Sequence, residues 1–148
     1  MSEHAATISW ERSGDDFSYE GYNRNHDWSF ESGVNVPASA APGYLGDPSR
    51  VDPEEAFVAA LASCHMLSFL AIAARKRLVV DRYADAAVGL MEKNEQGRLA
   101  ITRVTLRPRV EFRDGSPSDG ELARLHEMAH KNCFIANSVR TQVIVDPG

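Results

Sequence analysis

One stretch, residues 52–77, constrains the fold more than any other part of this 148-residue chain. It reads DPEEAFVAALASCHMLSFLAIAARKR and contains no Asp, Glu, Lys or Arg between Ala56 and Ala74. Its start is typical of a helix, because Asp52 can cap it, Pro53 suits the first helical position, and two acidic residues follow at the positive end of the helix dipole. Apolar and small residues occupy every face, so we expect this helix to be enclosed on all sides.

A membrane span is the first alternative, because the 19 uncharged residues fall within the length range for crossing a bilayer. Three polar side chains, Ser63, His65 and Ser68, lie in the middle of the stretch, and much of the remainder is alanine. The other segments are polar and β-like, and none is a second candidate span. We therefore expect a buried core helix and no membrane association.

Length and charge narrow the class of protein. A chain of 148 residues predicts a single domain, 1–148, with a core of useful size. The net charge of −5 argues against a nucleic-acid partner, because phosphate binding needs a basic surface. The N-terminus, MSEHAATISW, lacks the basic and then apolar pattern of a secretory signal, so we expect a cytoplasmic protein.

The residues before the apolar helix predict three strands and a long connection. Strands are expected at Thr7–Arg12 and Phe17–Tyr22, joined by a polar turn, and at Trp28–Ser32. The segment Val34–Val51 is rich in Pro, Gly, Ala and Ser and is expected to be irregular.

The residues after the apolar helix predict a strand pair, Ala84–Asn94 and Leu99–Phe112, with Pro108 marking an edge or a bulge. A second helix is expected from a cap at Ser118 to about Lys131. This helix is expected to bury Leu122, Leu125 and Ala129, and the final strand is expected at Val139–Val145. This order of elements predicts an α+β fold.

A fully apolar helix needs cover on every side, and one modest sheet covers only one. The simplest solution is a second chain, with the two helices packed together and wrapped by sheets from both subunits. We therefore expect a homodimer.

The two cysteines, Cys64 and Cys133, leave three interpretations open. Both could be buried small hydrophobic residues, a common fate of cysteine. They could belong to a zinc site, since His126 and His130 precede Cys133 at helical spacing, although these histidines could equally lie on a half-exposed helix face. They could instead perform thiol redox chemistry. A thiol enclosed by apolar groups has a raised pKa, so a reactive one needs a cation nearby; a two-unit shift takes about 3 kcal/mol.

The run DPEEAFVAALASCHMLSFLAIAA, followed much later by AHKNCFIANSV, resembles the OsmC/Ohr family of thiol-dependent hydroperoxide reductases. It is more similar to the OsmC-like branch than to Ohr proper. The resemblance covers most of the chain, including the early strands, the Pro-Glu helix start and both cysteines. It implies an α+β OsmC-like fold in which antiparallel sheets wrap a long buried central helix, in an intertwined homodimer.

The resemblance also implies roles for four residues. Cys64 would be the peroxidatic cysteine and Cys133 the resolving cysteine, which together form an intramolecular disulfide that an external thiol reduces. Arg24 is the best match to the family arginine that pairs with the reactive cysteine, with Arg12 and Arg50 as poorer candidates. Glu54 matches the glutamate of the Pro-Glu motif. Ten helical residues span roughly 15 Å, so Glu54 and Cys64 cannot meet on one straight helix. We therefore expect either that Glu54 acts from the partner subunit or that the first turn departs from the helix.

The expected function is reduction of organic hydroperoxides to alcohols, with no cofactor and no metal, regenerated by a thiol or dithiol. Apolar walls favour organic hydroperoxides over hydrogen peroxide, because alkyl burial adds binding energy. The alternative is a non-catalytic protein that binds an apolar ligand on the same dimeric scaffold, and an inaccessible Cys64 would favour it. A zinc-bound structural dimer is the third interpretation.

Overall fold

The computed structural model describes all residues, 1–148, and confirms the α+β class. The chain has two compact units, residues 1–56 and 57–148, which are described separately. A single domain spanning 1–148 stays a prediction.

The first unit contains a three-stranded antiparallel sheet in the order β1-β2-β3. Its elements are β1 (Ala6–Ser9), β2 (His26–Phe30), β3 (Asn35–Ala38) and the short 3-10 helix η1 (Pro42–Tyr44). The turn between β2 and β3 needs a glycine, because Gly33 has a φ of 84°.

Two expectations for this unit were wrong. Phe17–Tyr22 is not a strand but a series of turns, because Ser18 makes local hydrogen bonds that compete with a strand. Its backbone N–H donates to Asp16 Oδ1 at 2.8 Å, and its hydroxyl accepts from the N–H of Gly21 at 3.1 Å. The supposedly irregular segment after Val34 contains β3, which pairs with β2 although Pro37 lies within it.

Helix α1 (Pro53–Arg75) begins where the sequence predicts. The Asp52 carboxylate accepts from the backbone N–H of Glu55 at 2.8 Å, and the Glu55 carboxylate accepts from the backbone N–H of Asp52 at 3.2 Å. This reciprocal pair satisfies two backbone donors that the first helical turn leaves free. The helix ends as the chain reverses at Arg77, whose φ is 60°.

The second unit adds two sheets and a second helix to α1. The two-stranded sheet pairs β4 (Val80–Asp85) with β7 (Pro108–Phe112), and the three-stranded sheet has the order β5 (Val88–Lys93), β6 (Leu99–Leu106), β8 (Gln142–Val145). Helix α2 (Asp119–Asn132) follows the predicted cap at Ser118, and the 3-10 helix η2 (Ala136–Ser138) follows it. The expected antiparallel pairing is found throughout except between β6 and β8, which run parallel.

The predicted strand pair exists but is broken into two ladders. Each strand is interrupted, one at Ala86 and Ala87 and the other at Arg107. At the break the backbone N–H of Arg107 donates to Asp85 Oδ1 at 2.7 Å instead of to a neighbouring strand. Pro108 opens β7 in a two-stranded sheet, so it lies on an edge strand as predicted.

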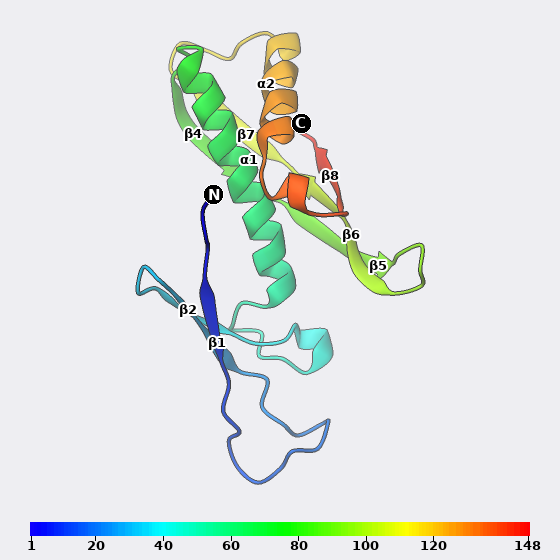
Figure 1. Cartoon of the computed structure of the whole chain (residues 1–148). Coiled ribbons are helices and arrows are strands. Elements are labelled where there is room, and N and C mark those ends of the chain that lie inside the picture. Colours follow the sequence, from blue (N-terminus) through cyan, green and yellow to red (C-terminus); the bar gives the residue numbers. More distant parts are fainter. The chain divides into compact units, whose positions relative to one another are not determined.

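The core of the second unit has two apolar clusters on one face of α1. Leu61 packs with Val104 and Leu106 of β6, and Phe69 packs in the cluster that contains Leu125 of α2. Helix α2 runs alongside α1 (Figure 1).

The single chain buries only this face of α1, and enclosure on all sides, which was expected to need a second chain, stays a prediction. The exposed residues of the opposite face recur at helical spacing: Ala60, Ser63, Leu67, Ala71 and Ala74. Helix α1 is long and apolar enough to cross a membrane by length and composition, a test that core helices of soluble proteins also pass.

Candidate functional site

The structure brings the two cysteines together in the second unit. Cys64 lies in the middle of α1 and is half-buried, whereas Cys133 caps the C-terminus of α2 and is 1% exposed. The two thiols are neighbours, close enough that Cys64 contributes to raising the pKa of Cys133. They are free thiols, so this is the reduced form of a pair that can be joined by a disulfide.

The surroundings of Cys133 keep it protonated. Burial raises the pKa of its thiol to about 11, with a smaller contribution from Cys64 in the same direction. The backbone N–H groups of Ile135 and Ala136 oppose this shift in pKa, the latter donating to Sγ at 3.4 Å. These donors lie at the start of the 3-10 helix η2.

Directly beside the cysteines lies a buried histidine pair whose pairing the sequence analysis missed. His65 Nε2 and His126 Nδ1 are 3.0 Å apart, and both side chains are buried. Burial lowers the pKa of each imidazole to about 4, and for His65 the nearby His126 and His130 add to the effect. Of the placements that the sequence left open for His126, the half-exposed helix face is excluded, because the side chain is buried. The sequence signal for the burial of His126 was its position between Leu125 and Ala129, both of which were expected to be buried.

The structure offers no set of donor side chains for the zinc site that the sequence left open. No group of three or more His, Cys, Asp or Glu side chains is arranged to hold a metal ion. His130 is close enough to influence His65, but its Nδ1 is buried without a hydrogen bond, as is Nδ1 of His65.

Arg24 is buried in the first unit and is fixed from several sides. Its guanidinium donates to the carbonyl of Tyr22 at 2.6 Å and to the carbonyl of Tyr19, and it lies 3.7 Å from the centre of the Tyr22 ring. His26 Nδ1 donates to the Arg24 carbonyl at 2.8 Å. Arg24 forms no ion pair within the chain, so its positive charge is oriented but not neutralised.

Glu54 lies in the first turn of α1 and is half-buried. Its neighbour Glu55 makes the capping hydrogen bond with Asp52, so Glu54 is not needed for the cap. Its carboxylate has no hydrogen bond or ion pair within the chain.

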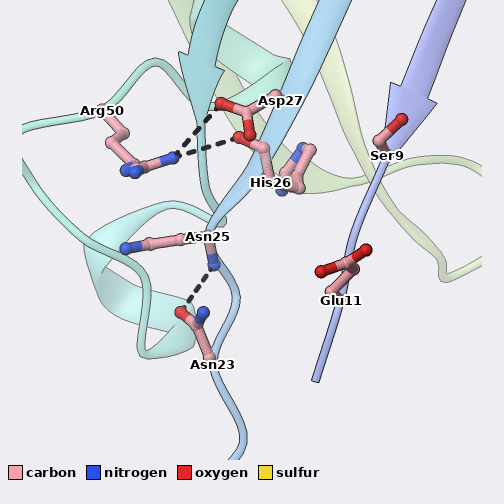
Figure 2. Close-up of a pocket in the computed structure, with 7 residues that line it drawn as sticks. All are labelled: Ser9, Glu11, Asn23, Asn25, His26, Asp27 and Arg50. Atoms are coloured by element: carbon pink, nitrogen blue, oxygen red, sulfur yellow. Dashed lines mark hydrogen bonds and ion pairs between the residues drawn. The ribbon is translucent and has the colours of Figure 1, made fainter. Parts of the chain in front are cut away.

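A polar pocket of about 390 Å³ lies between the strands of the first unit (Figure 2). Arg50 reaches into it, donating to the carbonyl of His26 at 3.1 Å and lying 3.8 Å from the Asp27 carboxylate. Its other lining residues are Ser9, Glu11, Asn23 and Asn25. Because Arg50 is paired with acidic side chains, it is a poorer source of free positive charge than Arg24.

The chemistry of the cysteine pair is that of a dithiol. Two thiols in contact can lose two electrons and two protons together by forming one disulfide. Cys64 is the more exposed partner and Cys133 the more buried one.

The sequence profile of the family described as "OsmC-like protein" matches residues 46–147. An OsmC-like protein of unknown function from Vibrio cholerae is 48% identical, with 99% of each chain covered and a TM-score of 0.95. None of the curated proteins compared with the chain matches it.

More distant solved structures share the fold. An organic hydroperoxide resistance protein from Elizabethkingia anophelis is 18% identical, covers 98% of this chain and 93% of its own, and has a TM-score of 0.72. A putative organic hydroperoxide resistance protein from Vibrio cholerae, with captopril bound in one of its active sites, is 22% identical, covers 100% and 94%, and has a TM-score of 0.73.

Proposed function

We propose, from the premise that the chain belongs to the OsmC-like protein family, that it is a thiol-dependent peroxidase that reduces organic hydroperoxides to alcohols. The observation that carries this proposal is the contact between the Cys64 and Cys133 thiols, one half-buried and the other fully buried. Family membership alone does not supply the activity, because the relative at 48% identity is of unknown function.

The proposed reaction begins at Cys64. Its thiolate attacks the terminal oxygen of the hydroperoxide, the O–O bond breaks, and the alkoxide leaves as the alcohol after taking a proton. Cys64 is thereby oxidised to a sulfenic acid. The sulfur of Cys133 then attacks the sulfenic sulfur, its own proton leaves with the hydroxyl as water, and the Cys64–Cys133 disulfide forms. An external dithiol, or two thiols, reduces the disulfide and is itself oxidised.

Arg24 is proposed to stabilise the Cys64 thiolate. Support comes from its buried, oriented guanidinium, which has no acidic partner within the chain, since a desolvated charge acts more strongly than an exposed one. Glu54, whose carboxylate is also unpaired, is proposed to hold that arginine from the partner subunit.

The homodimer is part of the same proposal. Five exposed small or apolar residues form one stripe on α1, which we name the α1 stripe: Ala60, Ser63, Leu67, Ala71 and Ala74. Small residues let two helices approach closely, and a second copy of α1 would cover the stripe. Light scattering with Glu54→Gln tests the shared site, because a fully active monomer would contradict it.

The proposed substrate preference comes from the apolar composition of α1 around Cys64. An alkyl or aryl group packed against apolar side chains gains binding energy that hydrogen peroxide cannot gain. We expect cumene hydroperoxide to react faster than hydrogen peroxide at equal concentration, and a faster reaction with hydrogen peroxide would contradict this preference.

The test of the activity is turnover of cumene hydroperoxide with a dithiol such as dihydrolipoamide, measured by loss of hydroperoxide. Wild type should turn over repeatedly, and Cys64→Ser should not exceed the uncatalysed rate. A wild type that does not exceed that rate would refute the proposal.

The alternative, a non-catalytic binder of apolar ligands, would be favoured by an inaccessible Cys64 with no arginine nearby. Within one chain Cys64 is half-buried rather than enclosed, which supports the peroxidase on the first of these two points.

A further inference from the structure

We propose that the hydrogen-bonded pair His65–His126 is a positioning device that holds Cys133 against Cys64 and so favours formation of their disulfide. This inference deepens the proposed function and depends on it for the use of the dithiol. Neither histidine touches the hydroperoxide in this proposal, so both are positioning residues.

The pair is a close and well-defined contact between α1 and α2. The Nε2–Nδ1 distance is 3.0 Å, the rings are parallel to within 7°, and their centres are 5.4 Å apart. Phe69 stacks on His126 with a centre-to-centre distance of 4.5 Å. His126 is therefore held by one contact at its polar edge and another at its face.

Each histidine is linked to one of the two cysteines. His65 directly follows Cys64 in α1, and His126 lies about two turns before Cys133, which caps the same helix. A second, longer hydrogen bond joins the same helices near Cys133, from Ser68 Oγ to the carbonyl of Asn132 at 3.5 Å. Because His126 is fixed against His65, the position of Cys133 at the end of α2 is also fixed relative to Cys64 on α1.

A hydrogen bond specifies this register more sharply than an apolar contact does, because it requires a short distance between two particular atoms. Sliding α2 along α1 would leave the two nitrogen atoms buried without partners, which is unfavourable. Apolar packing alone, as at Phe69 and Leu125, tolerates small shifts with less loss. A shift of a few tenths of an ångström matters little for the core but matters for two sulfur atoms that must form a bond.

The test compares variants of His126 by the equilibrium constant for the Cys64–Cys133 disulfide in glutathione redox buffer, measured by thiol trapping. His126→Phe keeps the aromatic face and removes the hydrogen bond, and we expect the constant to fall at least tenfold. His126→Asn places an amide near the position of Nδ1, and we expect it to stay within about threefold of wild type. His130→Phe, the same change one turn later on α2, is the matched control and should also stay within threefold.

Equal constants for wild type and His126→Phe would overturn the inference, as would an equal loss in His130→Phe. If circular dichroism shows that His126→Phe does not fold, His126→Leu is judged by the same two outcomes. The measurement needs no hydroperoxide, so it separates two failures. A wild type that forms no disulfide defeats the proposed function as well, whereas a normal disulfide that is insensitive to His126 defeats only the positioning role.

Discussion

The Cys133 thiol is in contact with the Cys64 thiol, although they lie on different helices and are 69 positions apart in the sequence. The contact is unequal, because Cys133 is fully buried and Cys64 is half-buried. Burial also keeps Cys133 protonated at neutral pH, since it raises the pKa of that thiol to about 11. In the proposed reaction this inequality supports Cys64 for the first, solvent-facing step and Cys133 for the second.

The pH dependence of the second step follows from this pKa. The attacking species is the Cys133 thiolate, whose fraction falls about tenfold for each pH unit below the pKa. We therefore expect the rate of disulfide formation from the Cys64 sulfenic acid to rise steeply, approaching tenfold per unit, between pH 6 and 9. Quenched-flow mass spectrometry after one equivalent of cumene hydroperoxide measures this rate. A rate independent of pH would show that deprotonation of Cys133 does not limit the step.

The histidine pair predicts a loss of stability in mild acid. His65 and His126 have pKa values of about 4 in the folded chain and about 6.5 when unfolded. The unfolded chain therefore binds protons first, so stability is complete above about pH 6.5 and falls as the pH decreases towards 4. Each histidine contributes a slope of up to about 1.4 kcal/mol per pH unit in this window.

Urea unfolding of wild type and His126→Phe between pH 4.5 and 7.5 measures the slope. The variant should lose part of the decline, because one buried histidine no longer titrates, while the remaining groups are common to both proteins. If wild type and His126→Phe lose stability with the same slope, protonation of His126 does not cause the loss of stability in acid.

The α1 stripe predicts that a charge at its centre prevents dimerisation. Leu67 and Leu99 are both 60% exposed, but only Leu67 lies on the stripe. A carboxylate buried between two helices would be strongly unfavourable, so Leu67→Glu should convert a dimer to a monomer in light scattering. Leu99→Glu, the matched control, should leave the dimer intact. A monomeric wild type, or a dimeric Leu67→Glu, would refute the interface.

The role proposed for Arg24 predicts that its removal slows the first step, the oxidation of Cys64 by the hydroperoxide. If its guanidinium stabilises the Cys64 thiolate, Arg24→Gln should lower the second-order rate of Cys64 oxidation by cumene hydroperoxide at least tenfold at pH 6. Arg12→Gln is the control, because Arg12 is an exposed arginine of the same unit that donates to Gly14. An unchanged rate in Arg24→Gln would remove Arg24 from the site.

The sequence predicted the features that depend on local chemistry. The cap at Asp52, the cap at Ser118 and the edge position of Pro108 each follow from side chains within a few residues, and each is confirmed. The strand expected at Phe17–Tyr22 failed for a related reason, because hydrogen bonds of Ser18 outweigh β-propensity in a segment with no strand partner.

Features that depend on long-range contacts were not predictable from residue patterns. The parallel pairing of β8 with β6 joins segments about 40 positions apart, and alternation along a strand does not reveal strand direction. The same holds for His65 and His126, since burial of the position was predictable but the pairing was not. The proximity of Cys64 and Cys133 came from a family resemblance, because 69 positions of sequence leave their distance open.

The most direct test of the central claim is intact-mass spectrometry with thiol counting, before and after one equivalent of cumene hydroperoxide, on wild type, Cys64→Ser and Cys133→Ser. We predict that wild type loses two thiols and about two mass units, as one disulfide requires. Cys133→Ser should trap an oxidised Cys64, and Cys64→Ser should stay reduced. Two intact thiols in wild type after exposure to the hydroperoxide would contradict the peroxidase account.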